Sequence, residues 1–372
     1  MDDSRILGVA LSMTAGVDAA FVRHLEENEV SPQEFFALSQ QELEARLGLH
    51  SNVRALDRMV RDEALFRARR EADFMSRHGI TTVSITDADY PSRLADFDRS
   101  PVTLYKYGGA DLDAQHILSV VGTRHSTAYG ARYIEKLIGE LASYLPGLTV
   151  VSGLALGIDT MAHCAALNAG LPTVAVLAHG LNTLYPSQNR DLARRIVERG
   201  GALLSEYPSG VTPFKSRFLE RNRIVATLTD AVVVVESAVK GGAMSTAAVA
   251  SSYGRELFAV PGRIGDEMSA GCNRLIRSRK ALMAGSAAEL MAELGWQPLG
   301  KAVTPPQREL FPELDGKTKT IFDCLRQNSD PMPLDTLRER TGIMVHDLMS
   351  LLGEMEFDGL VERLPGNRFV VV

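Results

Sequence analysis

The stretch best equipped for chemistry is Ser209–Arg223, SGVTPFKSRFLERNR, in which cations alternate with aromatic rings. It contains one acidic residue, Glu220. Its four cations are Lys215, Arg217, Arg221 and Arg223, and its two aromatic rings are Phe214 and Phe218. A single nucleic-acid strand requires this mixture, because phosphates pair with cations while bases stack on rings. Lys215 and Phe218 are three residues apart, so they would project from one side of a helix. The pattern alone leaves open a solvated helix with Phe218 in the core.

Glycine-bearing turns follow five of the apolar runs that we predict to be strands. These turns are Gly122-Thr123-Arg124, Ser152-Gly153, Ala178-His179-Gly180, Lys240-Gly241-Gly242 and Pro261-Gly262-Arg263. Glycine lets backbone N–H groups approach a phosphate, and the N-terminus of the following helix favours an anion. A single glycine of this kind is usually a tight turn, but five at one sheet edge predict an anion-binding rim. Asn273 and Arg274 add polar and cationic groups further along.

The elements that must position this rim lie within residues 115–296. Seven apolar runs are candidate strands: ILSVVG, LTVVSG, PTVAVLAHG, GALLSE, AVVVVES, LFAVPG and, more weakly, KALMAG. Helical stretches such as Ala128–Leu145, Asp159–Ala169 and Gln188–Arg199 lie between them. Such alternation predicts a doubly wound parallel sheet with both faces buried, in a Rossmann-like α/β core. Ligands bind such sheets at the carboxyl ends of the strands, where the glycine turns fall.

A small helical domain, of SAM or helix-hairpin-helix type, is predicted for residues 1–78. Within 38–49, Ser39 can cap a helix with Glu42, and a charged amphipathic helix is expected over Asn52–Arg77. The glycine-bounded hairpin of DNA-binding members of this class is missing, so we favour a packing role. From residue 79 the runs ITTVSI and TLYKYGG predict two strands that lead into a main domain over 79–296.

The C-terminal region reads as a linker and a third domain. Residues 297–317 contain four prolines and no sustained period, so they predict a linker. Residues 318–372 predict three short helices and two strands around a Pro-Gly-Asn turn, the layout of a winged helix. That segment has six basic and nine acidic side chains, with Asp347, Glu354 and Glu356 on the expected recognition helix. Those charges would repel phosphates, so we expect a structural or protein-contacting domain.

Bulk properties place few limits on function. The 372 residues predict two or three domains, and 45% hydrophobic with 23% charged residues is typical of a soluble globular protein. The net charge of −6 argues mildly against a nucleic-acid partner, although only the local density of cations decides this. Cys164, Cys272 and Cys324 lie far apart, so neither a disulfide framework nor a zinc site is expected. The N-terminus resembles neither a signal peptide nor a membrane span, so we expect a cytoplasmic protein without a membrane partner.

Known catalytic and cofactor motifs are missing from the sequence. No G-x-G-x-x-G follows the first strand, and there is no H-E-x-x-H or nucleophile elbow. Gly316-Lys317-Thr318 resembles the end of a P-loop, but Phe311 stands at its first glycine and no strand precedes it. His163 and His179 lie near the rim without a nucleophile partner, so we expect them to be structural. We therefore predict no catalytic residue, metal or cofactor.

An ordered series of motifs resembles one family. The segments Val121–Arg124, Ser152–Asp159, Leu204–Pro208, Arg221–Ile224, Val260–Gly262 and Gly271–Arg277 are similar to those of the DNA-processing protein A (DprA/Smf) family of bacterial recombination mediators. The resemblance covers roughly residues 79–296. It implies a cytoplasmic protein that binds single-stranded DNA, forms a homodimer through its Rossmann-like domain and helps load RecA recombinase during natural transformation.

The resemblance also implies site residues. Carried onto matching positions, the DNA contacts are Arg124, Gly153, Lys215, Phe218, Asn222 and Arg223. The predicted rim and its neighbouring polar groups complete the candidate set with Gly122, Thr123, Ser152, Arg221, Lys240, Gly241, Gly242, Asn273 and Arg274. Family members commonly have Ser at the position of Thr123. Thr123 also carries a hydroxyl, so the expected phosphate contact is kept.

Two other functions remain open at this point. Related Rossmann-like proteins hydrolyse nucleotide derivatives with a P-G-G-x-G-T-x-x-E loop, but the position of its Glu is filled here by Ala248 or Val249. Hydrolysis needs a titratable group in reach, which leaves Glu206 and Glu236 as weaker candidates. A nucleotide-sensing domain with a winged-helix output is the third possibility, although a mononucleotide has little use for the many cations of Lys215–Arg223.

Overall fold

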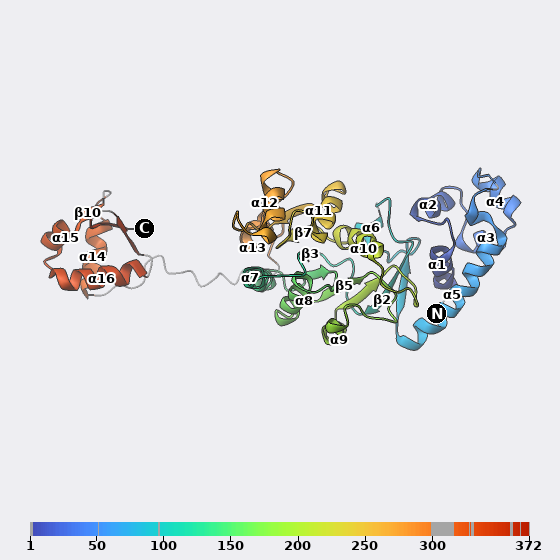
Figure 1. Ribbon diagram of the computed structural model, residues 1–372, viewed down its shortest axis with the longest axis horizontal. Helices are drawn as coiled ribbons and strands as arrows, with labels where there is room; N and C mark the ends of the chain where they lie inside the picture. The colour runs from blue at the N-terminus through green and yellow to red at the C-terminus, as the bar shows by residue number, and fades with distance from the viewer. Residues whose placement is uncertain are drawn as a thin grey trace. The chain divides into compact units, whose positions relative to one another are not determined.

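The computed structural model describes residues 3–50, 52–95, 97–298, 316–326, 328, 331–357, 360–364 and 366–371. Its contacts divide the chain into two units, Met1–Ala302 and Val303–Val372. The first unit contains N-terminal helices followed by a large sheet, and the second contains three helices and short strands (Figure 1). All of the predicted rim lies in the first unit.

The N-terminal helices form a small bundle with its own apolar core. Their bounds are α1 (Asp3–Met13), α2 (Ala19–Glu27), α3 (Pro32–Ala37), α4 (Gln40–Leu47), the 3₁₀ turn η1 (Arg54–Leu56) and α5 (Arg58–His78). The predicted cap of α4 is confirmed: Ser39 Oγ accepts from Glu42 N, and the Glu42 carboxylate accepts from Ser39 N at 2.8 Å. Leu43 and Leu47, four residues apart on α4, are both buried in this core.

The predicted start of the long helix at Asn52 is wrong. The carboxylate of Asp57 accepts from Met59 N at 2.8 Å and caps α5, so the helix begins at Arg58. Residues 54–56, Arg-Ala-Leu, form the separate turn η1 instead. The residue pattern continues across this break, so it predicted a single helix. The capping hydrogen bond of Asp57 decides where the helix begins.

The sheet has nine strands in the described residues, in the order β1-β2-β6-β5-β4-β3-β7-β8-β9. The strands are β1 (Thr81–Ser84), β2 (Thr103–Gly108), β3 (Ile117–Val121), β4 (Thr149–Ser152), β5 (Thr173–Leu177), β6 (Ala202–Ser205), β7 (Ala231–Val234), β8 (Glu256–Ala259) and β9 (Leu282–Met283). From β6 to β9 all pairs are parallel, which confirms the predicted core. The two lead-in strands extend the sheet antiparallel at the β6 edge, so the complete sheet is mixed.

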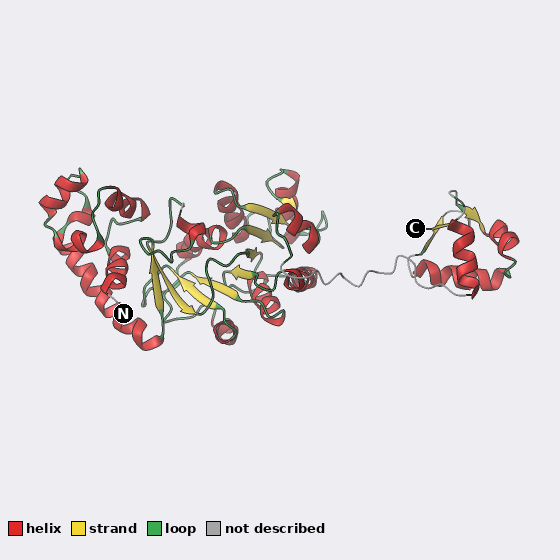
Figure 2. Cartoon of the chain, turned by 180° about the vertical axis from the view of Figure 1, so that it is seen from behind, coloured by secondary structure: helices red, strands yellow, loops and turns green. Residues whose placement is uncertain are grey.

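Helices cover both faces of the sheet (Figure 2). One face packs α7 (Ala128–Tyr144), α8 (Ile158–Asn168) and α13 (Ala287–Glu293), and the other packs α10 (Lys215–Thr227), α11 (Gly242–Ser252) and α12 (Ala270–Arg277). Strand β3 shows the alternation, since Leu118 and Val120 lie in the first of these cores while Ile117 and Val121 lie in the second. Burial on both faces explains the near-continuous apolar strands. Among the helices described, none is long and apolar enough to cross a membrane.

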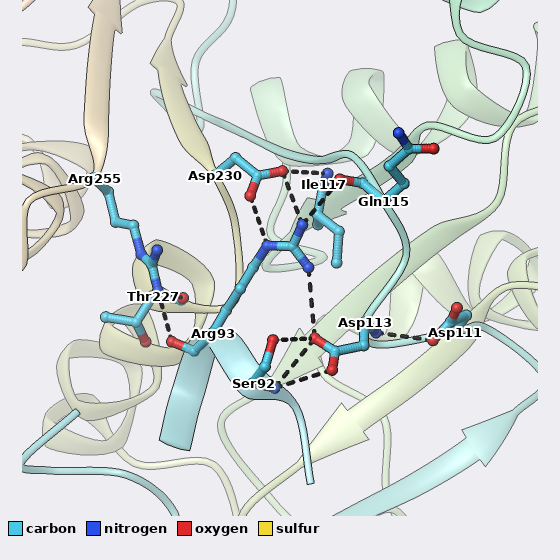
Figure 3. Close-up of polar contacts among 9 residues, drawn as sticks. All are labelled: Ser92, Arg93, Asp111, Asp113, Gln115, Ile117, Thr227, Asp230 and Arg255. Atoms are coloured by element: carbon cyan, nitrogen blue, oxygen red, sulfur yellow. Dashed lines mark hydrogen bonds and ion pairs between the residues drawn. The ribbon is translucent and has the colours of Figure 1, made fainter. Parts of the chain in front are cut away.

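A polar network fixes the amino ends of the two central strands (Figure 3). Arg93, in the short helix α6 (Ser92–Ala95), donates to both carboxylate oxygens of Asp230 at 2.7 and 3.1 Å. Asp230 directly precedes β7, and its Oδ2 also accepts from the backbone N of Ile117, the first residue of β3, at 2.9 Å. Arg255 donates to the carbonyl of Arg93 at 2.6 Å. The lead-in segment is thereby anchored to β3 and β7 at once.

The second unit has the predicted winged-helix layout. Its elements are α14 (Gly316–Arg326), β10 (Met332–Pro333), α15 (Leu334–Thr341), α16 (Val345–Phe357), β11 (Val361–Leu364) and β12 (Arg368–Val371), with sheet order β10-β12-β11. An apolar core that includes Phe322, Leu348 and Phe369 joins the helices to the sheet. Gly316 and Lys317, predicted to end the linker, begin α14 instead. The rest of that predicted linker, apart from 297 and 298, lies outside the described residues.

Candidate nucleic-acid interface

A cleft of about 740 Å³ opens at the carboxyl ends of β3, β4 and β7. The strand order reverses here, since β4 to β6 lie on one side of β3 and β7 to β9 on the other. Crossover connections leave the sheet on opposite faces at such a point, which opens a crevice for a ligand. The candidates that line it are Gly122, Thr123, Arg124, Gly153, Lys215, Phe218, Arg221, Asn222, Gly241 and Gly242. Tertiary structure thus brings together ten of the fifteen predicted residues.

The turn after β3 forms one wall of the cleft. A Cβ on Gly122 would lie 2.5 Å from the Ile158 side chain and 2.9 Å from the carbonyl of Glu236, so only glycine fits there. Thr123 N donates to that same carbonyl at 2.7 Å, and its Oγ1 accepts from His125 N at 3.1 Å. These contacts hold the turn rigid and leave the exposed Arg124 at its tip.

Phe218 lies at the centre of a group of rings and cations. The Arg124 guanidinium stands over its ring at 5.7 Å, and the ring of Tyr185 lies 5.7 Å away with a 60° tilt. Lys215 opens α10 one turn before Phe218, as their spacing predicted, and both line the cleft. Phe218 is half-buried, so one part of its ring anchors the helix and the rest faces the cleft. An open cleft with several rings is suited to unstacked bases.

Arg221 requires a correction, because its side chain lies beneath the rim and is 4% exposed. It donates through Nη1 to the carbonyl of Gly153 at 2.6 Å and also to the carbonyl of Val176. A Cβ on Gly153 would lie 2.5 Å from this guanidinium. Arg221 therefore supports the rim from below, through hydrogen bonds to carbonyl groups of the protein itself.

A buried carboxylate accompanies this arginine. Asp159 Oδ2 accepts from Ala155 N at 3.3 Å and so stabilises the turn before α8, whose N-cap Gly157 offers no side chain. Burial raises the pKa of Asp159, and the positive charge of Arg221 acts in the opposite direction. Asp159 and Arg221 thus hold the two sides of the turn that runs from Gly153 to α8.

Two further candidates on α10 differ in their position relative to the cleft. Asn222 lines it, donates from Nδ2 to Ser245 Oγ at 3.1 Å and accepts at Oδ1 from Arg221 Nε at 3.3 Å. Arg223 pairs with Glu206 at 2.5 Å, and both side chains are only 13% exposed. The sequence set only Glu220 against Arg223, and the structure adds Glu206 from the end of β6; the DNA contact of Arg223 stays a prediction.

Four other candidates lie outside the cleft. Ser152 is fully buried and donates to the carbonyl of Val120 at 2.7 Å, so its predicted contact is corrected to a structural one. Lys240 is exposed beside the cleft without lining it. Asn273 uses its amide to accept from Gly262 N at 3.1 Å and to donate to the carbonyl of the same residue at 2.9 Å. Arg274 lines a separate hollow of about 400 Å³.

The structure adds residues that sequence reasoning did not select. Tyr185 lines the cleft from the segment after β5. In the sequence, only its aromatic side chain close behind a predicted glycine turn could have indicated it. Asn189 is buried and donates from Nδ2 to the carbonyl of Leu154 and to Thr160 Oγ1, each at 2.9 Å. Leu154 has a φ of 55°, a left-handed conformation that costs energy for a branched side chain. Asn189 thus holds a strained turn beside Gly153.

The two histidines near the rim are structural, as predicted. His163 is buried with Nδ1 2.7 Å from Thr173 Oγ1, and burial lowers its pKa to about 3. His179 is buried as well, and its Nε2 accepts from Tyr185 N at 3.2 Å. Within the part of the chain that the structure describes, no three His, Cys, Asp or Glu side chains gather closely enough to hold a metal ion.

Sequence comparisons place the chain in a family. The family described as DNA recombination-mediator protein A matches residues 81–295, and the DprA winged helix domain matches residues 304–367. Protein Smf of Escherichia coli is 36% identical over 290 residues, covering 75% of this chain and 74% of its own. The DNA processing protein DprA of Streptococcus pneumoniae is 40% identical over 210 residues, covering 56% of this chain and 73% of its own.

Solved structures agree with this placement. The X-ray structure of DprA from Streptococcus pneumoniae superposes with a TM-score of 0.64 at 33% identity, over 76% of this chain and 95% of its own. A second structure is described by the single-stranded DNA binding mode of DNA processing protein A from Helicobacter pylori. It superposes with a TM-score of 0.53 at 31% identity, over 59% of this chain and 97% of its own. The resemblance noted in the sequence is confirmed by both comparisons: the chain belongs to the DprA/Smf family of DNA processing proteins.

Proposed function

We propose that this chain binds single-stranded DNA in the cleft and acts there without catalysing a reaction. The observation that carries the proposal is the meeting of cations, rings and a helix N-terminus in one open cleft: Arg124, Lys215, Phe218, Tyr185 and Gly242 at the start of α11. Backbone N–H groups and cations bind consecutive phosphates, while Phe218 stacks a base. The Helicobacter pylori relative, described by its single-stranded DNA binding mode, supports this assignment.

A single strand fits this cleft better than a duplex or a mononucleotide. Rings can stack on a base only where the base is unpaired and unstacked from its neighbours. A single phosphate group would pair with one of the two exposed cations and leave the other without a partner, because Arg124 and Lys215 come from different elements of the cleft. Contacts to phosphate carry no sequence information, so we expect little sequence preference.

Binding without chemistry is supported by the state of the nearby carboxylates. Glu236 is buried and accepts from Thr127 N at 2.9 Å and from Thr127 Oγ1 at 2.5 Å. Glu206 is paired with Arg223, and Asp159 lies under the rim beside Arg221. A general acid or base must reach the reacting group, and each of these carboxylates is committed to holding the protein itself.

Fluorescence anisotropy with labelled poly-dT and duplex DNA at several salt concentrations tests this proposal. We expect tight, salt-dependent binding that prefers the single strand. Lys215→Ala should reduce the slope of log K against log salt by about 0.7, because one phosphate contact is lost. Phe218→Ala should weaken binding by about 1–3 kcal/mol without changing the slope, since a stacking contact releases no counterion. Equal affinity for duplex, or no binding by the wild type, would overturn the proposal.

We also propose a homodimer that forms through the free edge of the sheet. Strand β9 pairs only with β8 in the described residues, and its Leu282 and Met283 side chains are 42% and 59% exposed. The hollow beside α11 and α12 adjoins Leu257 on the neighbouring strand β8. An unpaired edge with apolar side chains is suited to pairing with a second copy. Two joined clefts would raise the affinity for long strands by linking two binding events.

Light scattering tests the dimer. Wild type should be dimeric at micromolar concentration, and Met283→Glu should be monomeric, with weaker binding of long strands and unchanged binding of short ones. A monomeric wild type that still binds long strands tightly would contradict the dimer and leave the cleft assignment intact.

Finally, we propose that the protein protects incoming single strands in the cytoplasm and helps load RecA recombinase during natural transformation. Membership of the recombination-mediator family supports this step. The test is the ATPase activity of RecA on a single strand coated with single-strand-binding protein. Wild type should stimulate it and Phe218→Ala should not. Tight DNA binding without stimulation would refute the RecA step alone.

A further inference from the structure

The loop before α10 connects the cleft with the N-terminal helices. Pro213 and Phe214, which follow this loop, line the cleft together with Tyr185, whereas Ser237 and Gly242 line it beside α11. The chain that enters α10 reaches Pro213 from the loop 207–212. That loop is held against the turn after β5, because Gly210 N donates to Asn182 Oδ1 and Gly180 N donates to the Val211 carbonyl, each at 2.9 Å.

The same loop is bound by a side chain of α5. Ser209 donates to Glu71 twice, from its backbone N to Oε1 at 2.8 Å and from its hydroxyl to Oε2 at 2.5 Å. Glu71 is 7% exposed, so this carboxylate is buried against the loop. Pro213 is four steps along the chain from Ser209, so at most about 14 Å of chain lies between the residue bound to α5 and the residue that lines the cleft.

Two arginines lie on α5 beside this contact. Arg67 is one turn before Glu71, and Arg70 lies about 100° around the helix on the same flank. Both are exposed, and neither has an acidic partner within 4.0 Å among the described residues, although Glu63 lies one turn before Arg67. Arg69 is a natural comparison, since it lies about 200° from Glu71, on the far side of the helix.

We propose that a single strand longer than the cleft leaves it beside Tyr185, crosses the loop at Ser209 and binds α5 through Arg67 and Arg70. This inference rests on the proposed binding of single-stranded DNA and adds a second contact surface to it. The ligand class is a polynucleotide backbone, because the surface offers cations that phosphates can pair with. Glu71 acts as a positioning residue that joins α5 to the loop, and the N-terminal domain is part of the DNA path.

The test compares two oligonucleotides, dT5 and dT20, with the full chain and the variant Arg67→Ala/Arg70→Ala. Binding of dT5 should be unchanged, because the cleft is intact. Binding of dT20 should weaken about 10–30-fold at 0.1 M salt, with a salt slope smaller by about 1.4, since two phosphate contacts are lost. The control Arg69→Ala/Arg199→Ala removes the same charge, with Arg199 ahead of the amino end of β6, and should bind both strands as wild type.

The outcomes separate this inference from the proposed function. If wild type binds neither strand, the proposed function itself fails. If wild type binds both and the Arg67→Ala/Arg70→Ala variant binds dT20 as tightly as the control does, the path over α5 is refuted and the cleft assignment stands. An equal loss in both variants would show a general charge effect and would also refute the specific path.

Discussion

Arginine side chains have different surroundings at the two ends of strands β3 and β7. At the amino ends, Arg93 is 13% exposed and its charge is neutralised by Asp230, which also accepts from the backbone of β3 (Figure 3). At the carboxyl ends, Arg124 is exposed and rests on the face of Phe218 without a carboxylate partner among the described residues. The same pair of strands thus carries one arginine that holds the fold and one that is left for a ligand.

A similar division separates the arginines of the cleft itself. Arg221 and Arg223 are two residues apart, yet one lies beneath Gly153 and the other pairs with Glu206, while Lys215 stays exposed. Buried or paired cations contribute to stability and rim geometry, whereas exposed ones contribute to phosphate binding and its salt dependence. Stability and salt slope are therefore separate measurements for the two classes.

The largest expected effect comes from Arg221→Met. This change removes the positive charge that acts on the buried Asp159 carboxylate and the donor to the carbonyls of Gly153 and Val176, so the free energy of unfolding should fall by about 3–5 kcal/mol. Urea denaturation at pH 7 measures it, with Arg217→Met on the same helix as the control, expected within about 0.5 kcal/mol of wild type. A small loss for Arg221→Met would place this arginine among the ligand-binding cations instead.

The same variant should show a distinct pH dependence. Burial already raises the pKa of Asp159 in the folded protein, and loss of Arg221 removes the interaction that lowers it. A carboxyl with a raised pKa destabilises the fold as pH rises from its ordinary value of 3.8 through the folded pKa. The deficit of Arg221→Met relative to wild type should therefore be smaller at pH 4.5 than at pH 7. A constant deficit across this range would argue against the Asp159 pairing.

An intermediate effect is expected from Asp230→Ala at the opposite edge. It removes the partner of Arg93 and the acceptor for Ile117 N, so we expect about 2–3 kcal/mol of destabilisation by urea denaturation. Binding of dT20 at a temperature where the variant is folded should match wild type. A loss of affinity there would show that the amino-edge network also shapes the cleft.

The smallest effect separates a paired from a free cation. The double variant Glu206→Gln/Arg223→Gln removes a neutral pair, so its salt slope for poly-dT should equal that of wild type. Lys215→Gln should lower the slope by about 0.7, or about fivefold in affinity at 0.1 M salt. If the double variant lowers the slope as much as Lys215→Gln, Arg223 contacts phosphate in the complex and the distinction between the two cations fails.

Local patterns determined a large part of the fold. The apolar runs identified the parallel strands, Ser39 and Glu42 identified the cap of α4, and the Pro-Gly-Asn turn identified the wing. These features depend on neighbours in sequence, since burial periodicity and capping are local. The antiparallel addition of β1 and β2 was not predictable in the same way, because strand pairing joins residues that are about a hundred positions apart in the chain.

The candidate site divides along the same line. Residue types and glycine turns by themselves predicted a candidate rim at the carboxyl ends of the strands, with Lys215 and Phe218 on one helix face, and the structure brings these residues to one cleft. Only the tertiary structure decided which cations remain without a protein partner. Glu206 pairs with Arg223 from the end of another strand, and the carbonyl of Gly153 accepts from Arg221 beneath the rim. A sequence lists charges, but their availability depends on burial and on partners brought from distant segments, and these exist only once the sheet has formed.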